Sequence, residues 1–143
     1  MQYERIIDIL DPNAEDREDP PPVNANTLNI YFQYLLPRLR PGLLMTGNDT
    51  CGYFSWEERF FFGFGDEALH KKMRRKKASS EDKFKFMELL EEDAPTGLIA
   101  KLKRISDNQI FHIPLMDLEV CEKKIAQWQI VDDYVTWIVN LIG

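Results

Sequence analysis

Histidine and cysteine, the side chains that most often act as bases, nucleophiles or zinc ligands, occur only twice each in this chain. Nucleophilic catalysis needs a nucleophile, a base and a third group that orients the base. His70 belongs to a basic run and His112 alternates with apolar residues, so neither has these partners near it in the sequence. Cys51 and Cys121 are far apart, whereas zinc ligands usually come in closely spaced pairs. We therefore expect no enzymatic activity, no zinc site and two free thiols.

Carboxylates are far more numerous, and they gather in two clusters, at residues 8–19 and 88–93. The chain has 24 acidic and 18 basic residues and a formal net charge of −6. Calcium takes six to eight oxygen ligands from such side chains. The stretch that begins at Asp11 is not an EF-hand loop, because Asp16 stands where that loop needs glycine and Pro22 where it needs glutamate. We expect the side chains of this stretch to be solvated.

If the chain binds calcium, its ligands are better sought in the second cluster, because a predicted strand precedes that cluster and can fix its position. The end of a neighbouring predicted strand can add further oxygens. The candidate ligands are Glu91, Glu92, Asp93, Asp117 and Glu119.

One strongly basic run opposes these acids, at residues 71–77. The run predicts a partner-binding surface made of Lys71, Lys72, Arg74, Arg75, Lys76 and Lys77. Three other interpretations are open: a solvated face that the chain's own acidic segments neutralise, a surface that contacts nucleic-acid phosphates, and a surface that docks on a membrane. Because a net negative charge repels a polyanion, we expect no nucleic-acid complex at physiological salt. An acidic protein surface is the candidate partner.

The N-terminal part of the chain must contain at least one helix. A cluster of apolar residues at 1–10 fits either a helix or a strand. The acidic residues 11–22 end in three prolines, which predicts a linker or loop. Asn26 or Thr27 can then cap a helix that ends near Leu36, because a proline follows it.

The basic run itself fits a helix at 66–77, which begins with acids and ends with cations, as a helix dipole favours. Leu69 and Met73 are the pair that would face the core of the protein. Short strands are expected at residues 43–45, 60–62 and 83–90.

The clearest local pattern is a hairpin of residues 98–105 and 110–113, which turns at 106–109 and ends at Pro114. Its first strand alternates between apolar and basic side chains, which is typical of a half-buried antiparallel strand. The C-terminal residues fit both helix and strand templates, and we favour a short helical turn at 131–134 followed by a strand at 135–141.

The chain of 143 residues has a common size for one domain, so residues 1–143 are expected to form a single domain that includes the loop 11–22. Aromatic residues make up 12% of the chain, which favours a core that contains a sheet. No apolar run reaches the roughly 18 residues of a membrane span, and the first residues do not resemble an export signal. These features predict a soluble, cytoplasmic protein.

Three segments together carry a resemblance to a known family: residues 28–35 (LNIYFQYL), 99–105 (IAKLKRI) and 111–119 (FHIPLMDLE). Their order is an apolar helix, a basic strand, and a strand that ends in Pro-Leu-x-x-Leu. This order resembles the cyanobacterial-type family of small acidic calcium-binding proteins, which lack EF-hands. The resemblance implies an SH3-like barrel and calcium binding, although this chain carries an additional stretch at 46–77.

Together, these patterns predict an α+β fold, with an N-terminal helix on a small bent antiparallel sheet or SH3-like barrel. A basic helix is inserted between two strands. The predicted function is that of a non-enzymatic binding protein, which binds calcium through acidic loops. The alternative is an interaction module that binds a protein or nucleic acid through the basic helix at 71–77.

Overall fold

The structure is a computed structural model that describes residues 2–48, 52–57, 60, 63, 65–91 and 97–141. Its α-helices are α1 (Gln2–Leu10), α2 (Ala25–Leu35), α4 (Glu67–Arg74) and α5 (Ala126–Leu141). Its strands are β1 (Leu44–Gly47), β2 (Lys83–Leu90), β3 (Ile99–Arg104), β4 (Ile110–Pro114) and β5 (Leu118–Val120). The described 3-10 helices are η1 (Ser55–Glu57) and η2 (Leu115–Asp117).

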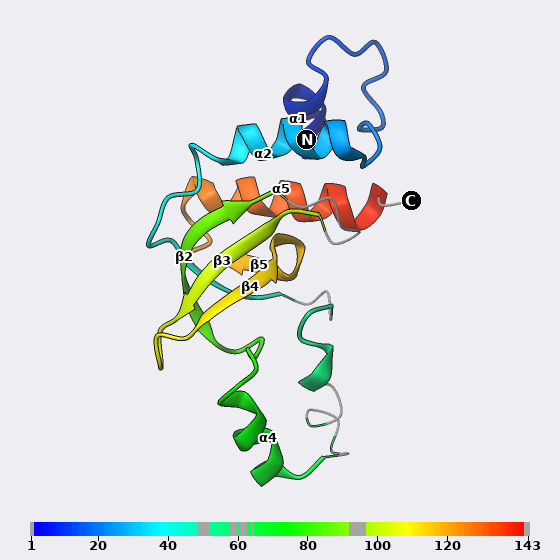
Figure 1. Cartoon of the computed structure of the whole chain (residues 1–143). Helices are drawn as coiled ribbons and strands as arrows, with labels where there is room; N and C mark the ends of the chain where they lie inside the picture. Colours follow the sequence, from blue (N-terminus) through cyan, green and yellow to red (C-terminus); the bar gives the residue numbers. More distant parts are fainter. Residues whose placement is uncertain are drawn as a thin grey trace.

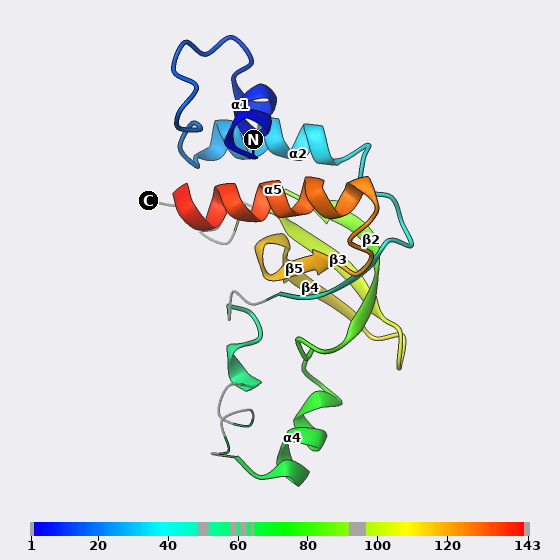
Figure 2. The same ribbon diagram turned by 180° about the vertical axis from the view of Figure 1, so that it is seen from behind.

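These elements form layers in which α5 lies between the sheet and the N-terminal helices (Figure 1). α2 runs along the far side of α5, and α1 lies beyond α2, as the view from behind also shows (Figure 2). α4 stands away from these layers, at the opposite end of the molecule. Helices that are layered against an antiparallel sheet make this an α+β fold, as the sequence predicts.

The sheet has five strands in the order β4-β3-β2-β1-β5, and each neighbouring pair is antiparallel. β4 and β5 form its two edges, so of the two predicted forms the open, bent sheet is observed rather than a closed barrel. α4 lies in the connection between β1 and β2, which confirms that the basic helix is inserted between strands.

The predicted hairpin is confirmed by the pairing of β3 with β4. Leu102 lies opposite Phe111, and both side chains are buried. Lys101 and Lys103 point to the other face of the sheet and are only half-buried. β4 ends at Pro114, because proline cannot donate a hydrogen bond to a continuing ladder.

A bulge interrupts the alternation of β2. Phe86 lies opposite Leu102, but Glu88 lies opposite Lys101, so Met87 is an extra residue on this strand. Strict alternation would place Glu88 on the same inner face as the buried Phe86. Because of the bulge, Glu88 is exposed instead. Met87 is half-buried on the outer side of the sheet.

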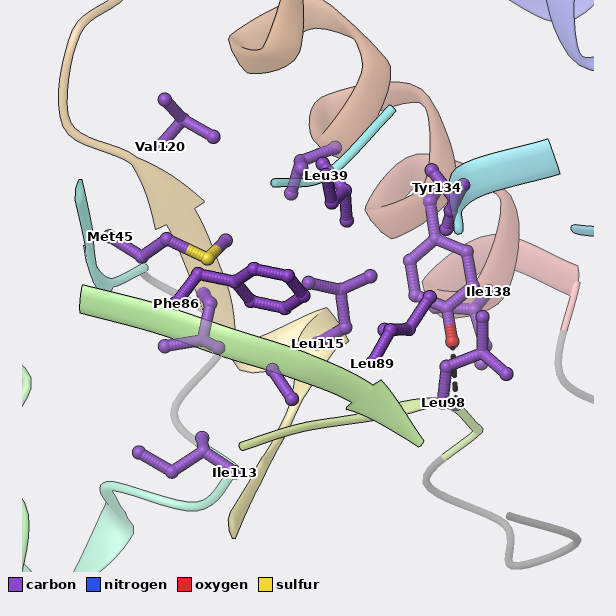
Figure 3. Packing of buried hydrophobic residues seen from close by; sticks show 14 of the residues in the cluster. Leu39, Met45, Phe86, Leu89, Leu98, Ile113, Leu115, Val120, Tyr134 and Ile138 are labelled. Atoms are coloured by element: carbon purple, nitrogen blue, oxygen red, sulfur yellow. Dashed lines mark hydrogen bonds between the residues drawn. The ribbon is translucent and has the colours of Figure 1, made fainter. Parts of the chain in front are cut away.

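The core lies between the inner face of the sheet and α5 (Figure 3). Met45, Phe86 and Leu115 fill this space with apolar side chains that are buried. The Tyr134 hydroxyl of α5 accepts a hydrogen bond of 2.9 Å from the backbone N–H of Leu98, so the buried phenol also fixes the start of β3.

The C-terminal segment corrects the sequence interpretation, because residues 135–141 do not form a strand. They belong to α5, a single helix of 16 residues. Val131, Tyr134 and Ile138 recur at helical spacing and are buried together. β-branched and aromatic residues favour strands, but this preference is weak, and the burial of an apolar helical stripe overrides it.

Asn24, rather than Asn26 or Thr27, caps α2. The Asn24 carboxamide oxygen accepts a hydrogen bond of 2.9 Å from the Thr27 N–H, and the Thr27 hydroxyl accepts one of 2.9 Å from the Asn24 N–H. This reciprocal capping box satisfies donors that the first turn leaves unpaired. α2 ends at Leu35, close to the predicted position.

Asp133 of α5 joins α1 to α5. Its carboxylate accepts hydrogen bonds of 2.9 Å from the Arg5 guanidinium and 2.9 Å from the Gln2 side chain. A third donor, the Gln129 side chain, lies 2.8 Å away. The buried charge of Asp133 is therefore fully partnered, and it anchors the first helix against the last described one.

Four smaller findings bear on the sequence interpretation. Residues 1–10 are helical from Gln2, and the loop 11–22 contains neither helix nor strand. Phe60 is in no strand, while Phe61, Phe62 and Cys51 lie outside the described residues.

Cys121 is free and half-buried, and burial raises the pKa of its thiol. Among the described residues, no helix is both long enough and apolar enough to cross a membrane.

Candidate functional site

The basic segment belongs to the connection between β1 and β2, and we call its described residues (48, 52–57, 60, 63 and 65–82) the arm. A buried glutamate anchors the arm. Glu57 is only 1% exposed. Its carboxylate accepts hydrogen bonds from the Ser79 hydroxyl at 2.7 Å and from the Ser80 N–H at 2.8 Å. His70 of α4 completes the cluster, with its Nε2 atom 2.9 Å from a Glu57 oxygen. Because a buried carboxylate is costly unless it is partnered, these contacts hold η1, α4 and the approach to β2 together.

Aromatic rings add an apolar layer beside this anchor. The His70 ring stacks on Phe60 at a centroid distance of 4.7 Å and lies 5.7 Å from the Trp56 ring. The Trp56 indole N–H donates a hydrogen bond of 2.9 Å to the carbonyl oxygen of Ala78. The structure therefore gives His70 a structural position inside the arm, whereas His112 is exposed on β4.

Arg104, at the end of β3, is the second anchor of the arm. Its side chain is 3% exposed, and its guanidinium donates to the carboxylates of Asp82 at 2.9 Å and Asp107 at 2.7 Å. It also donates to three carbonyl oxygens at or just after the C-terminal end of α4, those of Arg74, Arg75 and Lys77. Such carbonyls have no partner within the helix, so one guanidinium closes the end of α4 and fixes it to the sheet.

Five of the six predicted partner-binding residues are exposed around this fixed end. We call them the basic face, and they are Lys71, Lys72, Arg75, Lys76 and Lys77. None of them forms an ion pair with another described residue. The sixth, Arg74, is half-buried and pairs with Asp82 at 3.0 Å, so it serves the fold of the arm.

α4 corrects one detail of the sequence interpretation, since Leu69 and Met73 do not form a core-facing pair. Leu69 is 39% exposed, Met73 is half-buried, and α4 has no buried residue. The helix stands out from the layers of the body (Figure 1), and among the described residues its ring contacts include those of His70 with Phe60 and Trp56. Glu57 contacts the middle of the helix through His70, and Arg104 binds its C-terminal end, so polar anchors take the place of a buried apolar stripe.

Comparison with known proteins adds no further guide to the function. No family model, curated protein or solved structure matches the chain. The resemblance to the calcium-binding family therefore stays a prediction, and the chemistry of the site has to carry any assignment.

The candidate calcium ligands lie at two separate places. Glu91 is exposed directly after β2, and Glu92 and Asp93 lie outside the described residues. Asp117 and Glu119 flank Leu118, which pairs with Gly47 near the start of β2. β2 spans about 25 Å at 3.3 Å per residue, so Glu91 and Asp117 are at opposite ends of the sheet. Within the described part of the chain, no three acidic, histidine or cysteine side chains are grouped as metal ligands.

Asp117 is nevertheless a notable carboxylate, because it is only 1% exposed. It accepts a hydrogen bond of 3.2 Å from the N–H of Tyr53, and the backbone of Gly52 packs closely against it. The Asn48 side chain donates to the carbonyl oxygens on either side of Asp117, at 2.8 and 3.0 Å. These contacts tie the first part of the arm to η2.

Sequence reasoning missed both anchors of the arm. The alternation that points Leu98 and Leu102 inward continues to Arg104, so the sequence did contain a sign that this arginine is buried. Glu57 has no comparable sign, because its partners come from the segment 70–80 and only the folded arm brings them together.

Proposed function

We propose that this chain is a non-enzymatic binding protein, and that its basic face binds an acidic surface of another protein. The carrying observation is that five exposed cations surround a helix end that Arg104 holds rigidly. A preformed surface binds with a smaller loss of conformational freedom than a mobile one, which favours recognition at this place.

The position of the chain's own acids supports this proposal over a face that is neutralised within the molecule. The acidic loop 11–22 lies beside α1 and α2, at the end of the molecule opposite α4 (Figures 1 and 2). Exposed charges that are more than about 10 Å apart are largely screened at physiological salt. The loop therefore cannot neutralise the basic face. The nearer carboxylates of Asp82 and Asp107 line a pocket with Lys71 and Arg75, but both carboxylates pair with Arg104.

A binding assay with a fluorescein-labelled oligoglutamate peptide tests this function. Arg75→Glu with Lys76→Glu reverses two charges of the basic face, and we expect affinity to fall about tenfold or more. Lys123→Glu with Lys124→Glu makes the same charge change at exposed positions between β5 and α5, and it should leave affinity nearly unchanged. Equal losses in both variants, or no binding by the native chain, would contradict the proposal.

The same assay with a labelled DNA duplex separates protein from nucleic-acid partners. Phosphate contacts by the basic face would give an affinity that falls with salt, by a log-log slope of roughly 0.9 per phosphate neutralised. We expect no complex at physiological salt, since the net charge of −6 opposes a duplex, which is a longer and more densely charged polyanion than the peptide. A submicromolar complex that salt weakens would assign the basic face to nucleic acid.

Calcium binding is a second proposal, supported by Asp117 and by the family resemblance. Asp117 offers a positioned carboxylate next to Gly52. Calcium prefers such oxygens, and a loop ligand set can complete its shell. Calorimetric titration with calcium chloride should give heat in the native chain and less in an Asp117→Asn variant, whereas Glu91→Gln, at the other end of the sheet, should leave the heat of this site unchanged. A flat titration at millimolar calcium, with an unchanged melting temperature, would exclude this function.

A further inference from the structure

A row of four side chains crosses the outer face of the sheet, from β1 to β4. Leu44 lies opposite Lys85, Lys85 lies opposite Lys103, and Lys103 lies opposite Ile110. We call these four residues the lysine row. The neighbouring residues on each strand, such as Met45 and Phe86, are buried on the inner face, so the row faces outward. It spans three strand spacings, which is about 14 Å.

The two ends of the row are exposed apolar side chains. Leu44 is 45% exposed and Ile110 is 47% exposed, which are high values for large residues on a well-ordered sheet. Single exposed apolar residues are common, but here two of them flank a pair of cations in one line across the sheet. The row therefore combines apolar and cationic contacts on one surface.

The two central lysines oppose each other directly. Like charges at directly opposite positions of an antiparallel pair destabilise the sheet. Neither Lys85 nor Lys103 has an ion-pair partner among the residues that the structure describes. A carboxylate brought by a partner would remove this repulsion, so the pair is complementary to a negative charge.

A shallow pocket opens beside the lysine pair. Its volume is about 280 Å³, and Pro41, Gly42 and Met87 line it together with the two lysines. The bulge of β2 turns Met87 to this side and so supplies part of the apolar lining. Pockets for whole small molecules usually measure about 300–1,000 Å³, so this one is better suited to a single side chain.

We propose that the lysine row is a second docking surface, which binds an acidic segment of a partner protein. A large apolar side chain of that segment occupies the pocket, and carboxylates on either side of it contact Lys85 and Lys103. This surface lies on the sheet and shares no residue with the basic face, so the proposal goes beyond the function given above. A nucleic acid would meet the lysines but has no apolar side chain for the pocket or for Leu44 and Ile110.

The test uses the full chain and a fluorescein-labelled peptide with the central sequence Glu-Asp-Leu-Asp-Glu. We expect Lys103→Glu to weaken peptide binding about tenfold or more, and Arg75→Glu with Lys76→Glu to weaken it less, because only the lysine row has a pocket beside it for the leucine. A peptide in which the leucine is replaced by serine should bind more weakly. Amide resonances of β2 and β3 should shift when the peptide is added.

Several results would overturn the proposal. These are no binding by the native chain, equal binding of the serine peptide, or a larger loss in the basic-face variant than in Lys103→Glu. Tighter binding of a fluorescein-labelled oligothymidylate than of the peptide would assign the row to nucleic acid instead. Concentration-dependent dimerisation in sedimentation, lost in Lys103→Glu, would assign it to a second copy of the chain. Lys85→Ser provides a second variant that removes one charge without adding another.

Discussion

The Nε2 atom of His70 lies 2.9 Å from a carboxylate oxygen of Glu57, and this contact joins α4 to η1 across the arm. Glu57 also accepts hydrogen bonds from the side chain and backbone of the Ser79–Ser80 pair. A carboxylate that is 1% exposed thus organises a segment whose helix has no buried residue of its own. The position of the basic face depends on this polar cluster.

Replacing Glu57 with alanine should therefore loosen the arm. Its loss leaves the donors of Ser79, Ser80 and His70 without their acceptor, and we expect a loss of about 1–3 kcal/mol in the free energy of unfolding. Hydrogen exchange should become faster in α4 while the amides of β3 keep their protection. Glu88→Ala, at an exposed position of β2, is the control and should change stability by less than about 0.5 kcal/mol.

Acid should weaken the anchor at Arg104. The hydrogen bond from the Arg104 guanidinium lowers the pKa of Asp107. A group whose pKa is lower in the folded state stabilises the fold above its ordinary value, near pH 4, and this contribution is lost as the pH falls through the lowered pKa. The difference in melting temperature between the native chain and Asp107→Asn should therefore shrink below about pH 4.

The matching control is Asp19→Asn, at an exposed position of the loop 11–22. The melting temperature of Asp19→Asn should differ little from that of the native chain at all pH values between 2 and 7, as is usual for surface substitutions. A constant difference between the native chain and Asp107→Asn down to pH 2 would show that the carboxylate does not act through Arg104.

Two buried tyrosines should respond in opposite ways to removal of their hydroxyls. The Tyr31 hydroxyl is buried and has no hydrogen-bond partner among the described residues. Tyr31→Phe should thus keep or raise stability, by up to about 1 kcal/mol. Tyr134→Phe removes the acceptor of the Leu98 N–H and should cost about 0.5–1.5 kcal/mol. Urea unfolding of both variants checks this, and equal losses would mean that Tyr31 has a partner.

In the lysine row, we expect that Lys103→Glu, which should weaken partner binding, also raises the free energy of unfolding. Lys103→Glu turns the like-charged pair with Lys85 into an opposite-charged one, and we expect a gain of about 0.2–1 kcal/mol in the free energy of unfolding. Thermal unfolding at low and high salt should show that the gain decreases as salt is added, because Lys85 is exposed and Lys103 is only half-buried. A loss of stability would indicate that Lys103 already has a favourable partner.

Local patterns were sufficient for the elements whose contacts are close in the sequence. The β3–β4 hairpin followed from alternation, a polar turn and Pro114, and the insertion of α4 followed from its charge pattern. The helix α5 did not follow, since residues 135–141 carry strand-forming side chains and only their packing shows the helical stripe.

The sequence predicted which residues supply the cations of the candidate site, but not the contacts that hold them in place. A run of cations at 71–77 is visible in any reading of the sequence, and most of its members are exposed. The anchors that hold the run are long-range pairs, such as Arg104 with the end of α4, and no local pattern reports them. The register of the lysine row likewise depends on how four strands align, which the alternation of each strand does not determine.

The hydrogen bonds from Gln2 and Arg5 of α1 to Asp133 of α5 affect the order in which the molecule can fold during translation. α1 leaves the ribosome long before α5 exists, so Gln2 and Arg5 are made long before Asp133, the carboxylate that later anchors them. β5 must also wait for its synthesis before it can join β1 at the sheet edge. Contacts of such high sequence separation form slowly, so the core between the sheet and α5 can close only after the last described helix has been made.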